Sequence, residues 1–244
     1  MEDTLWASAL ETVKGYTFKI STPNSMGTGF LITKSFNDIL AVATAYHVIS
    51  HAYEWEDPIK LLHSATNKQI VLKSPDRFIF VKKQRDVTVI MFQKEDLKIA
   101  KKILTISPEG KFLRPGIQIG WAGYPAIAPE QFSFFSGCVS CLLEREEAYL
   151  VDGVAINGVS GGPAFTVFSN GDIHIIGLVS AYIPNRVTGE SLPGVCFVAS
   201  IMPFYDFIKG IKSLDEARKK SENEIPEANK QIQDNSKNNK RISI

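Results

Sequence analysis

The sequence is poor in cysteine and lacks the N-terminal features of an exported protein. It has three cysteines among 244 residues, Cys138, Cys141 and Cys196, an odd number that is too small to cross-link a chain of this length. The first residues include two acids where a secretory signal carries Lys or Arg, and no apolar segment follows them. We therefore expect a cytoplasmic protein without a disulfide framework.

A strong net charge and a long hydrophobic run are also missing. Lys and Arg number 27 against 26 Asp and Glu, which leaves a formal charge of +1 and no basic field that would attract nucleic acid. The most apolar stretch, residues 39–49, is interrupted by Thr44 and His47 and is shorter than the roughly 20 residues of a membrane span. We expect no nucleic-acid or membrane partner, and the pattern leaves the oligomeric state unassigned.

The apolar pattern predicts an all-β protein in two halves. Helical spacing over residues 5–13 predicts a short leading helix, and the chain then turns to short β segments without long helical patterns between them. The predicted segments are 16–20, 29–33, 39–44, 59–62, 70–73, 78–81 and 87–92 in the first half, and 117–122, 134–142, 148–151, 164–168, 174–180 and 194–199 in the second. We predict two six-stranded antiparallel β-barrels.

The predicted domains divide the chain in three. Residues 1–105 form the N-terminal barrel with its leading helix, and residues 106–211 form the C-terminal barrel with a closing helix over 203–211. Residues 212–244 are rich in Lys, Glu, Asn, Gln and Ser, and bury too little apolar surface to offset ordering entropy. We predict a disordered polar tail there.

The segment Gly158-Val-Ser-Gly-Gly-Pro163 surrounds one hydroxyl with glycines. Attack on a carbonyl needs an accessible hydroxyl beside N–H groups aimed at the developing oxyanion, and glycines allow that close approach. Ser160 is therefore the candidate nucleophile, and a Gly-rich turn with an incidental serine is the alternative. The segment also fits the nucleophile elbow of α/β-hydrolases, but that fold needs an acid and then a histidine after the serine, and His174 follows too soon.

A serine nucleophile needs a base, and His47 is the best placed of the four histidines. It ends an apolar segment that we predict as a strand. His51 lies four residues further on, but the intervening residues lack the glutamate of the zinc-protease motif, so we predict no metal site and no cofactor. His63 and His174 lie in alternating polar and apolar segments, where we interpret them as structural.

Asp86 is the candidate acid that orients the base. It directly precedes the apolar segment 87–92, and an acid beside a buried strand is costly without a defined partner. The alternative is an aspartate that makes a turn contact at a strand edge. Asp57, Asp76 and Asp96 lie in more polar surroundings.

The order His47, Asp86, Ser160 resembles the trypsin-like serine peptidases of the chymotrypsin fold, nearest the bacterial HtrA-like branch without a PDZ domain. The resemblance rests on the segments Gly27-Thr-Gly-Phe-Leu-Ile32, Thr44-Ala-Tyr-His-Val48, Arg85-Asp-Val-Thr-Val89, Gly120-Trp-Ala-Gly-Tyr-Pro125, Gly137-Cys-Val-Ser140 and Gly158-Val-Ser-Gly-Gly-Pro163. It implies two perpendicular β-barrels with the active site between them. It also implies an oxyanion hole made by the backbone N–H groups of Gly158 and Ser160.

The same resemblance predicts a substrate pocket and leaves some differences. The expected pocket residues are Val154, Ala155, Ile156, Ser180 and Tyr182, which carry no acid, so we predict an apolar, shallow pocket narrowed by the tyrosine ring. Tyr46 replaces the alanine that usually precedes the family's histidine. Val159 replaces the acid that digestive members use to pair with a newly cut N-terminus.

Two functions of different classes follow from these residues. The leading hypothesis is a serine endopeptidase that acts on a protein or peptide substrate through an acyl-enzyme. The alternative is a catalytically silent peptide-binding or scaffold protein on the same fold. Cys138 and Cys141 suggest neither redox chemistry nor zinc binding, because an offset of three residues places them on opposite faces of a regular strand.

Overall fold

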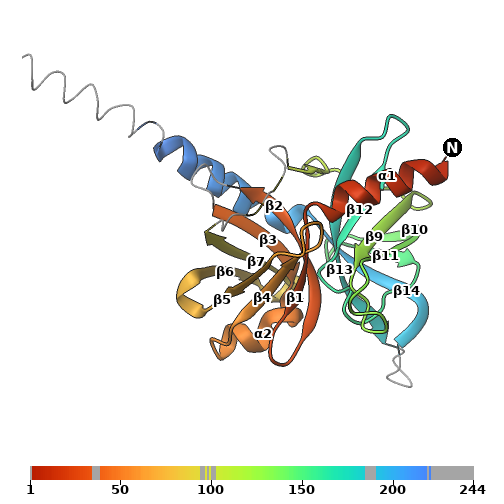
Figure 1. Cartoon of the computed structure of the whole chain (residues 1–244). Coiled ribbons are helices and arrows are strands. Elements are labelled where there is room, and N and C mark those ends of the chain that lie inside the picture. The colour runs from red at the N-terminus through yellow and green to blue at the C-terminus, as the bar shows by residue number, and fades with distance from the viewer. Residues whose placement is uncertain are drawn as a thin grey trace, which may run out of the picture. The chain divides into compact units, whose positions relative to one another are not determined.

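The structure is a computed structural model that describes residues 2–34, 39–93, 97, 99, 103–184, 191–218 and 220 (Figure 1). The chain forms one compact unit up to Tyr205, and a second unit begins at Asp206. The first unit contains both β-sheets. No helix of the described residues is long and apolar enough to cross a membrane.

The N-terminal helix packs on the C-terminal sheet. This helix, α1, spans Glu2–Lys14 and contains the predicted helical stretch. Its Trp6 ring lies 5.6 Å from the ring of Phe134 and 5.8 Å from that of Phe165. Ala9 and Val13, further along the helix, are buried. Figure 1 shows α1 crossing the β12 side of this sheet.

The first sheet is antiparallel and curls into a half-barrel. Its strands are β1 (Thr17–Ser21), β2 (Met26–Lys34), β3 (Ile39–Ala45), β4 (Ile59–His63), β5 (Gln69–Leu72), β6 (Arg77–Lys82) and β7 (Val87–Gln93). They lie in the order β5-β4-β1-β2-β3-β7-β6. The interior strand β3 is apolar along nearly its whole length and buried on both faces.

The second sheet closes into a six-stranded barrel. Its strands are β8 (Thr105–Ile106), β9 (Gln118–Gly123), β10 (Ser133–Leu143), β11 (Ala148–Asp152), β12 (Pro163–Val167), β13 (Ile173–Pro184) and β14 (Ser191–Ser200). The order is β12-β9-β10-β11-β14-β13, and pairing of β12 with β13 closes the barrel. The short β8 adds to β13 in parallel. Trp121 and Tyr149 are the largest side chains of its core.

The predicted all-β fold is therefore confirmed, and every predicted segment overlaps a strand. The N-terminal sheet differs from the prediction in having seven strands and in forming a half-barrel. Helix α2 (Tyr46–Glu54) was not predicted: its buried residues Val48, Ile49 and Ala52 form a stripe too short to stand out beside the apolar strand before it. The division of the two halves at residue 105 stays a prediction.

The C-terminal helix extends further than predicted. Residues 205–218 are helical. The prediction of a disordered tail is therefore wrong for residues 212–218. From Lys212 the segment contains Leu, Glu, Ala, Arg and Lys, which are good helix formers even without burial. The remainder of the predicted tail, from 221 onwards, lies outside the described residues.

A β-bulge also corrects the prediction for Cys138 and Cys141. Cys138 pairs with Asp152 and Cys141 with Leu150, and the register shifts between Val139 and Cys141. Partners two residues apart on one strand point to the same face, so the bulge brings both thiols to one face of β10. Among the described residues, no group of three or more metal-ligating side chains is clustered.

Candidate active site

The structure brings His47 and Asp86 together at the end of the first sheet. His47 is the second residue of α2, directly after β3, and not the end of a strand as predicted. Asp86 follows the short 3-10 helix η2 (Lys83–Arg85) in a left-handed conformation, with φ of 51°. This backbone conformation is uncommon outside glycine, and aspartate is among the residues that tolerate it best.

Three hydrogen bonds fix the geometry of this pair. The backbone N–H of His47 donates to Oδ1 of Asp86 over 2.9 Å, and the Nδ1 atom lies 2.8 Å from Oδ2. The backbone N–H of Tyr46 donates to the Asp86 carbonyl over 3.0 Å. An ionised carboxylate only accepts, so Nδ1 carries the ring proton. The Nε2 atom is then the basic nitrogen of the ring.

Ser180 is a partner of Asp86 that the sequence did not reveal. Its hydroxyl donates to Oδ2 of Asp86 over 2.5 Å, and its side chain is buried on β13. The sequence predicts Ser180 in the substrate pocket, and no local pattern marks a serine as the partner of an acid 94 positions away. The bond links the first sheet to the second at the acid itself.

Ser160 lies where the two sheets meet. Its carbonyl accepts a hydrogen bond of 2.8 Å from the backbone N–H of Thr28 on β2. The following Gly161 has φ of 82°, and a Cβ there would lie 2.1 Å from the Thr28 carbonyl oxygen, so the turn requires glycine. Ser160 is partly exposed. Among the hydrogen bonds of the described residues, none joins its hydroxyl to His47.

The backbone around Gly158 presents two N–H groups. Gly158 has φ of 91°, and a Cβ there would lie 2.3 Å from the Tyr124 carbonyl oxygen. The carbonyl of Asn157 accepts a 2.6 Å hydrogen bond from Ala126, which turns the N–H of the same planar peptide, that of Gly158, the opposite way. In the described part of the chain, neither this N–H nor that of Ser160 donates to another backbone group.

The structure accounts for the two residues at which the sequence differs from the family it resembles. Val159 is fully buried in the core of the second barrel beside Trp121, so apolar packing anchors the loop. Tyr46 lies along α2, where its hydroxyl donates to Glu54 over 3.0 Å. The ammonium of Lys83 lies 5.1 Å from the centre of the Tyr46 ring, and the large side chain is accommodated on this surface.

Three of the residues expected in the pocket, Val154, Ala155 and Ile156, are apolar, whereas Ser180 bonds Asp86. Ala155 and Ile156 pack against the core of the second barrel, and Val154 is half-exposed. Cys196 belongs to the same core, and burial raises the pKa of its thiol to about 12, so it stays protonated and uncharged. The side chain of Tyr182 lies outside the described residues, and its predicted role stays a prediction.

The other histidines have partners away from this site. His63 is buried, with Nδ1 2.8 Å from the Thr66 hydroxyl and Nε2 3.0 Å from the Gly15 carbonyl. Burial lowers its pKa, and both ring nitrogens are engaged, as a structural histidine requires. His51 forms a second His–Asp pair, with Nδ1 3.0 Å from Asp57.

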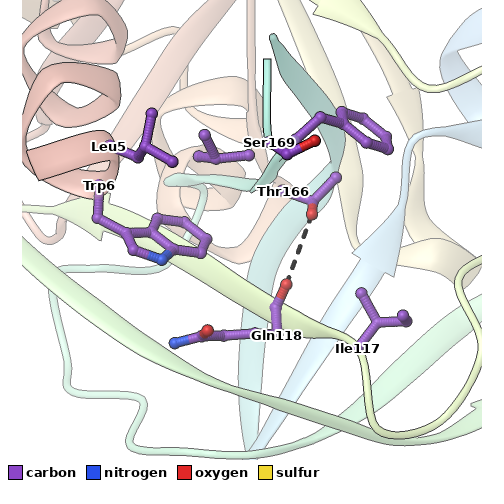
Figure 2. Close-up of a pocket in the computed structure, with 8 residues that line it drawn as sticks. Leu5, Trp6, Ile117, Gln118, Thr166 and Ser169 are labelled. Atoms are coloured by element: carbon purple, nitrogen blue, oxygen red, sulfur yellow. Dashed lines mark hydrogen bonds between the residues drawn. The ribbon is translucent and has the colours of Figure 1, made fainter. Parts of the chain in front are cut away.

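A separate hollow of about 530 Å³ lies under the N-terminal helix (Figure 2). Leu5 and Trp6 of α1 face the start of β9 and the end of β12 across it. The Thr166 hydroxyl donates to the Gln118 carbonyl over 3.5 Å at its border. The hollow lies at the C-terminal end of β12, whereas Ser160 precedes its N-terminal end. The hollow is therefore not part of the candidate active site.

The comparisons with known proteins support this fold. No protein-family description and no curated protein matches the chain. The crystal structure of Deg5 is 19% identical, with a TM-score of 0.61 over 83% of this chain and 94% of that one. Rv3671c from M. tuberculosis H37Rv, as the inactive form of its Ser343Ala mutant, is 15% identical, with a TM-score of 0.56 over 84% and 90%.

The inactive form of the Rv3671c protease gives a similar result. It is 16% identical, with a TM-score of 0.53 over 79% of this chain and 86% of that one. At these identities the likeness concerns the fold. The chain therefore has a double β-barrel fold of the kind found in trypsin-like proteases, in which the first sheet stays open as a half-barrel.

Proposed function

We propose that the protein is a serine endopeptidase. The Ser160 hydroxyl attacks the scissile carbonyl while Nε2 of His47 takes its proton, and the resulting imidazolium is stabilised by Asp86. The same proton passes to the leaving amine as the peptide bond breaks and the acyl-enzyme forms. Water, deprotonated by His47, then attacks the ester, and the acid product leaves as Ser160 regains its proton.

The observation that carries this proposal is the hydrogen-bonded arrangement around Asp86. Its carboxylate accepts from the His47 backbone, the His47 ring and the Ser180 hydroxyl, which fixes both the tautomer and the direction of the imidazole. The N–H groups of Gly158 and Ser160, which donate to no backbone group in the described part of the chain, supply the donors of an oxyanion hole.

The alternative is a catalytically silent peptide-binding protein. One observation favours it, namely that no hydrogen bond joins Ser160 to His47 within the described residues. This bond is often long in unliganded enzymes and shortens when substrate binds, so its absence does not decide between the two functions.

Labelling with a fluorophosphonate probe separates the two functions. An activated serine displaces fluoride and forms a phosphonate ester that is detected as a mass increase on the peptide containing Ser160. We expect labelling of the wild type, and none of Ser160→Ala or of heat-denatured protein. Absence of labelling in folded wild-type protein, together with peptide binding, would establish the silent alternative.

A further inference from the structure

Lys19 is a buried cation that lies outside the triad. It stands on β1 with 9% of its surface exposed, and its Nζ lies 2.7 Å from Oε1 of Glu130. The ring centre of Tyr124 lies 5.8 Å from the same ammonium. A charge removed from water is unfavourable unless an opposite charge lies close to it. Lys19 thus depends on Glu130, although the carboxylate itself is largely exposed.

Glu130 belongs to a compact loop of the second barrel. This loop, residues 124–132, follows β9 and contains two tight turns, in which Ala128 N–H donates to the Pro125 carbonyl and Gln131 N–H to the Ala128 carbonyl, both over 2.9 Å. Its two ends meet through the rings of Tyr124 and Phe132, whose centres are 5.6 Å apart. A loop closed in this way moves as one body. It is held against the first sheet at two points, by the ion pair with Lys19 and by the bond from the Tyr124 N–H to the Thr28 hydroxyl.

The same loop holds the peptide that precedes Gly158. Ala126 N–H donates to the Asn157 carbonyl over 2.6 Å, and this bond sets the direction of the Gly158 N–H. Gly158 has no Cβ and a positive φ, so the conformational cost of rotating this peptide is small without such a bond. An external hydrogen bond is therefore what selects one orientation of the peptide.

We propose that Lys19 and Glu130 are positioning residues for the oxyanion hole. The ion pair holds loop 124–132 on the first sheet, the loop holds the Asn157 carbonyl, and the Gly158 N–H is directed toward the substrate carbonyl as a result. The proposal rests on the serine-peptidase function proposed above. It gives the first sheet a further part in positioning the oxyanion hole, beside the bonds from Thr28 to the Gly158 and Ser160 carbonyls.

The test compares Glu130→Gln with wild type in the full chain. Loss of one oxyanion-hole donor lowers kcat by about 10²–10³-fold, and a loosened donor lowers it by part of that, so we expect a decrease of about tenfold or more. KM changes by less than about twofold, because the hole binds the transition state and not the substrate. Affinity for a peptide aldehyde falls with kcat, while affinity for the product peptide is unchanged.

Further variants separate positioning from general destabilisation. Glu144→Gln, an exposed carboxylate in the β10–β11 turn, is the matched control and leaves kcat unchanged. Glu130→Asp keeps the charge and recovers part of the loss. Lys19→Met reproduces the effect, and the double variant is no worse than either single one, because the pair acts as a unit. Hydrogen exchange at the Ala126 amide becomes faster in Glu130→Gln.

The outcomes distinguish this inference from the proposed function. A wild type that reacts with fluorophosphonate and hydrolyses peptides, beside a Glu130→Gln variant with wild-type kcat or unchanged Ala126 exchange, overturns the positioning role alone. A drop in melting temperature with equal losses of aldehyde and product affinity reduces the pair to a structural one and overturns it as well. A wild type that neither reacts nor hydrolyses overturns both proposals.

Discussion

Replacing Asp86 by asparagine is the sharpest test of the site, because the amide must meet three donors. If Oδ1 keeps the bond to the His47 backbone N–H, the amide NH₂ takes the place of Oδ2 and faces the Nδ1 proton and the Ser180 hydroxyl. The hydroxyl can rotate to accept. The imidazole can avoid two opposed protons only by moving its proton from Nδ1 to Nε2.

The opposite orientation of the amide is worse. It places NH₂ against the backbone N–H of His47, a donor that cannot rotate away. We therefore expect the first orientation, in which Nε2 is protonated and unable to accept the proton of Ser160. In Ser-His-Asp triads this wrong tautomer lowers kcat by about 10⁴, which corresponds to about 5.4 kcal/mol of transition-state stabilisation at 1.36 kcal/mol per tenfold change.

The assay is steady-state hydrolysis of a peptide, with thermal unfolding measured on the same preparations. The free energy of unfolding should fall by only about 1 kcal/mol, since the amide retains two of the three contacts. Asp57→Asn is a matched control, because Asp57 bonds Nδ1 of His51 on the same helix and takes no part in the site. Equal losses from the two variants, or no loss from Asp86→Asn, would refute the assignment of the acid.

Three further predictions follow from the site and the fold. Ser160→Ala should lower kcat by about 10⁶-fold and leave the melting temperature unchanged. Turnover near the wild-type rate would contradict the assignment of the nucleophile. Because burial lowers the pKa of His63, the unfolded chain binds its proton at a higher pH than the folded one, so stability present above about pH 6.5 is lost on acidification. Urea titrations at pH 5 and 7 measure this loss, and His63→Gln should weaken the pH dependence of the free energy of unfolding. Because Val154, Ala155 and Ile156 carry no acid, a peptide library should show little cleavage after Lys or Arg.

The sequence predicts those features that depend on local periodicity. Alternation and turn residues located thirteen strands, and the apolar face of α1 was evident from Trp6, Ala9 and Val13. The identities of His47, Asp86 and Ser160 as the candidate site came from their flanking motifs. In each case the signal lies within about ten residues of the position concerned.

Features set by contacts between distant strands were not predictable in this way. Ser180 acquires its role only when β13 meets the loop after η2. The bulge in β10 depends on the pairing with β11, and it reversed the expected faces of Cys138 and Cys141. The Lys19–Glu130 pair joins residues 111 positions apart, and neither side chain stands out in its own segment.

The site depends on how the two sheets are placed against each other more than on either sheet alone. The buried hydroxyl of Thr28 donates to the Gly158 carbonyl over 2.9 Å and accepts from the Tyr124 N–H over 3.1 Å, while the Thr28 N–H holds Ser160. Asp86 is bonded from both sides by His47 and Ser180. A small shift of one sheet against the other would therefore break several of these bonds together, whereas the strand ladders within each barrel would remain intact.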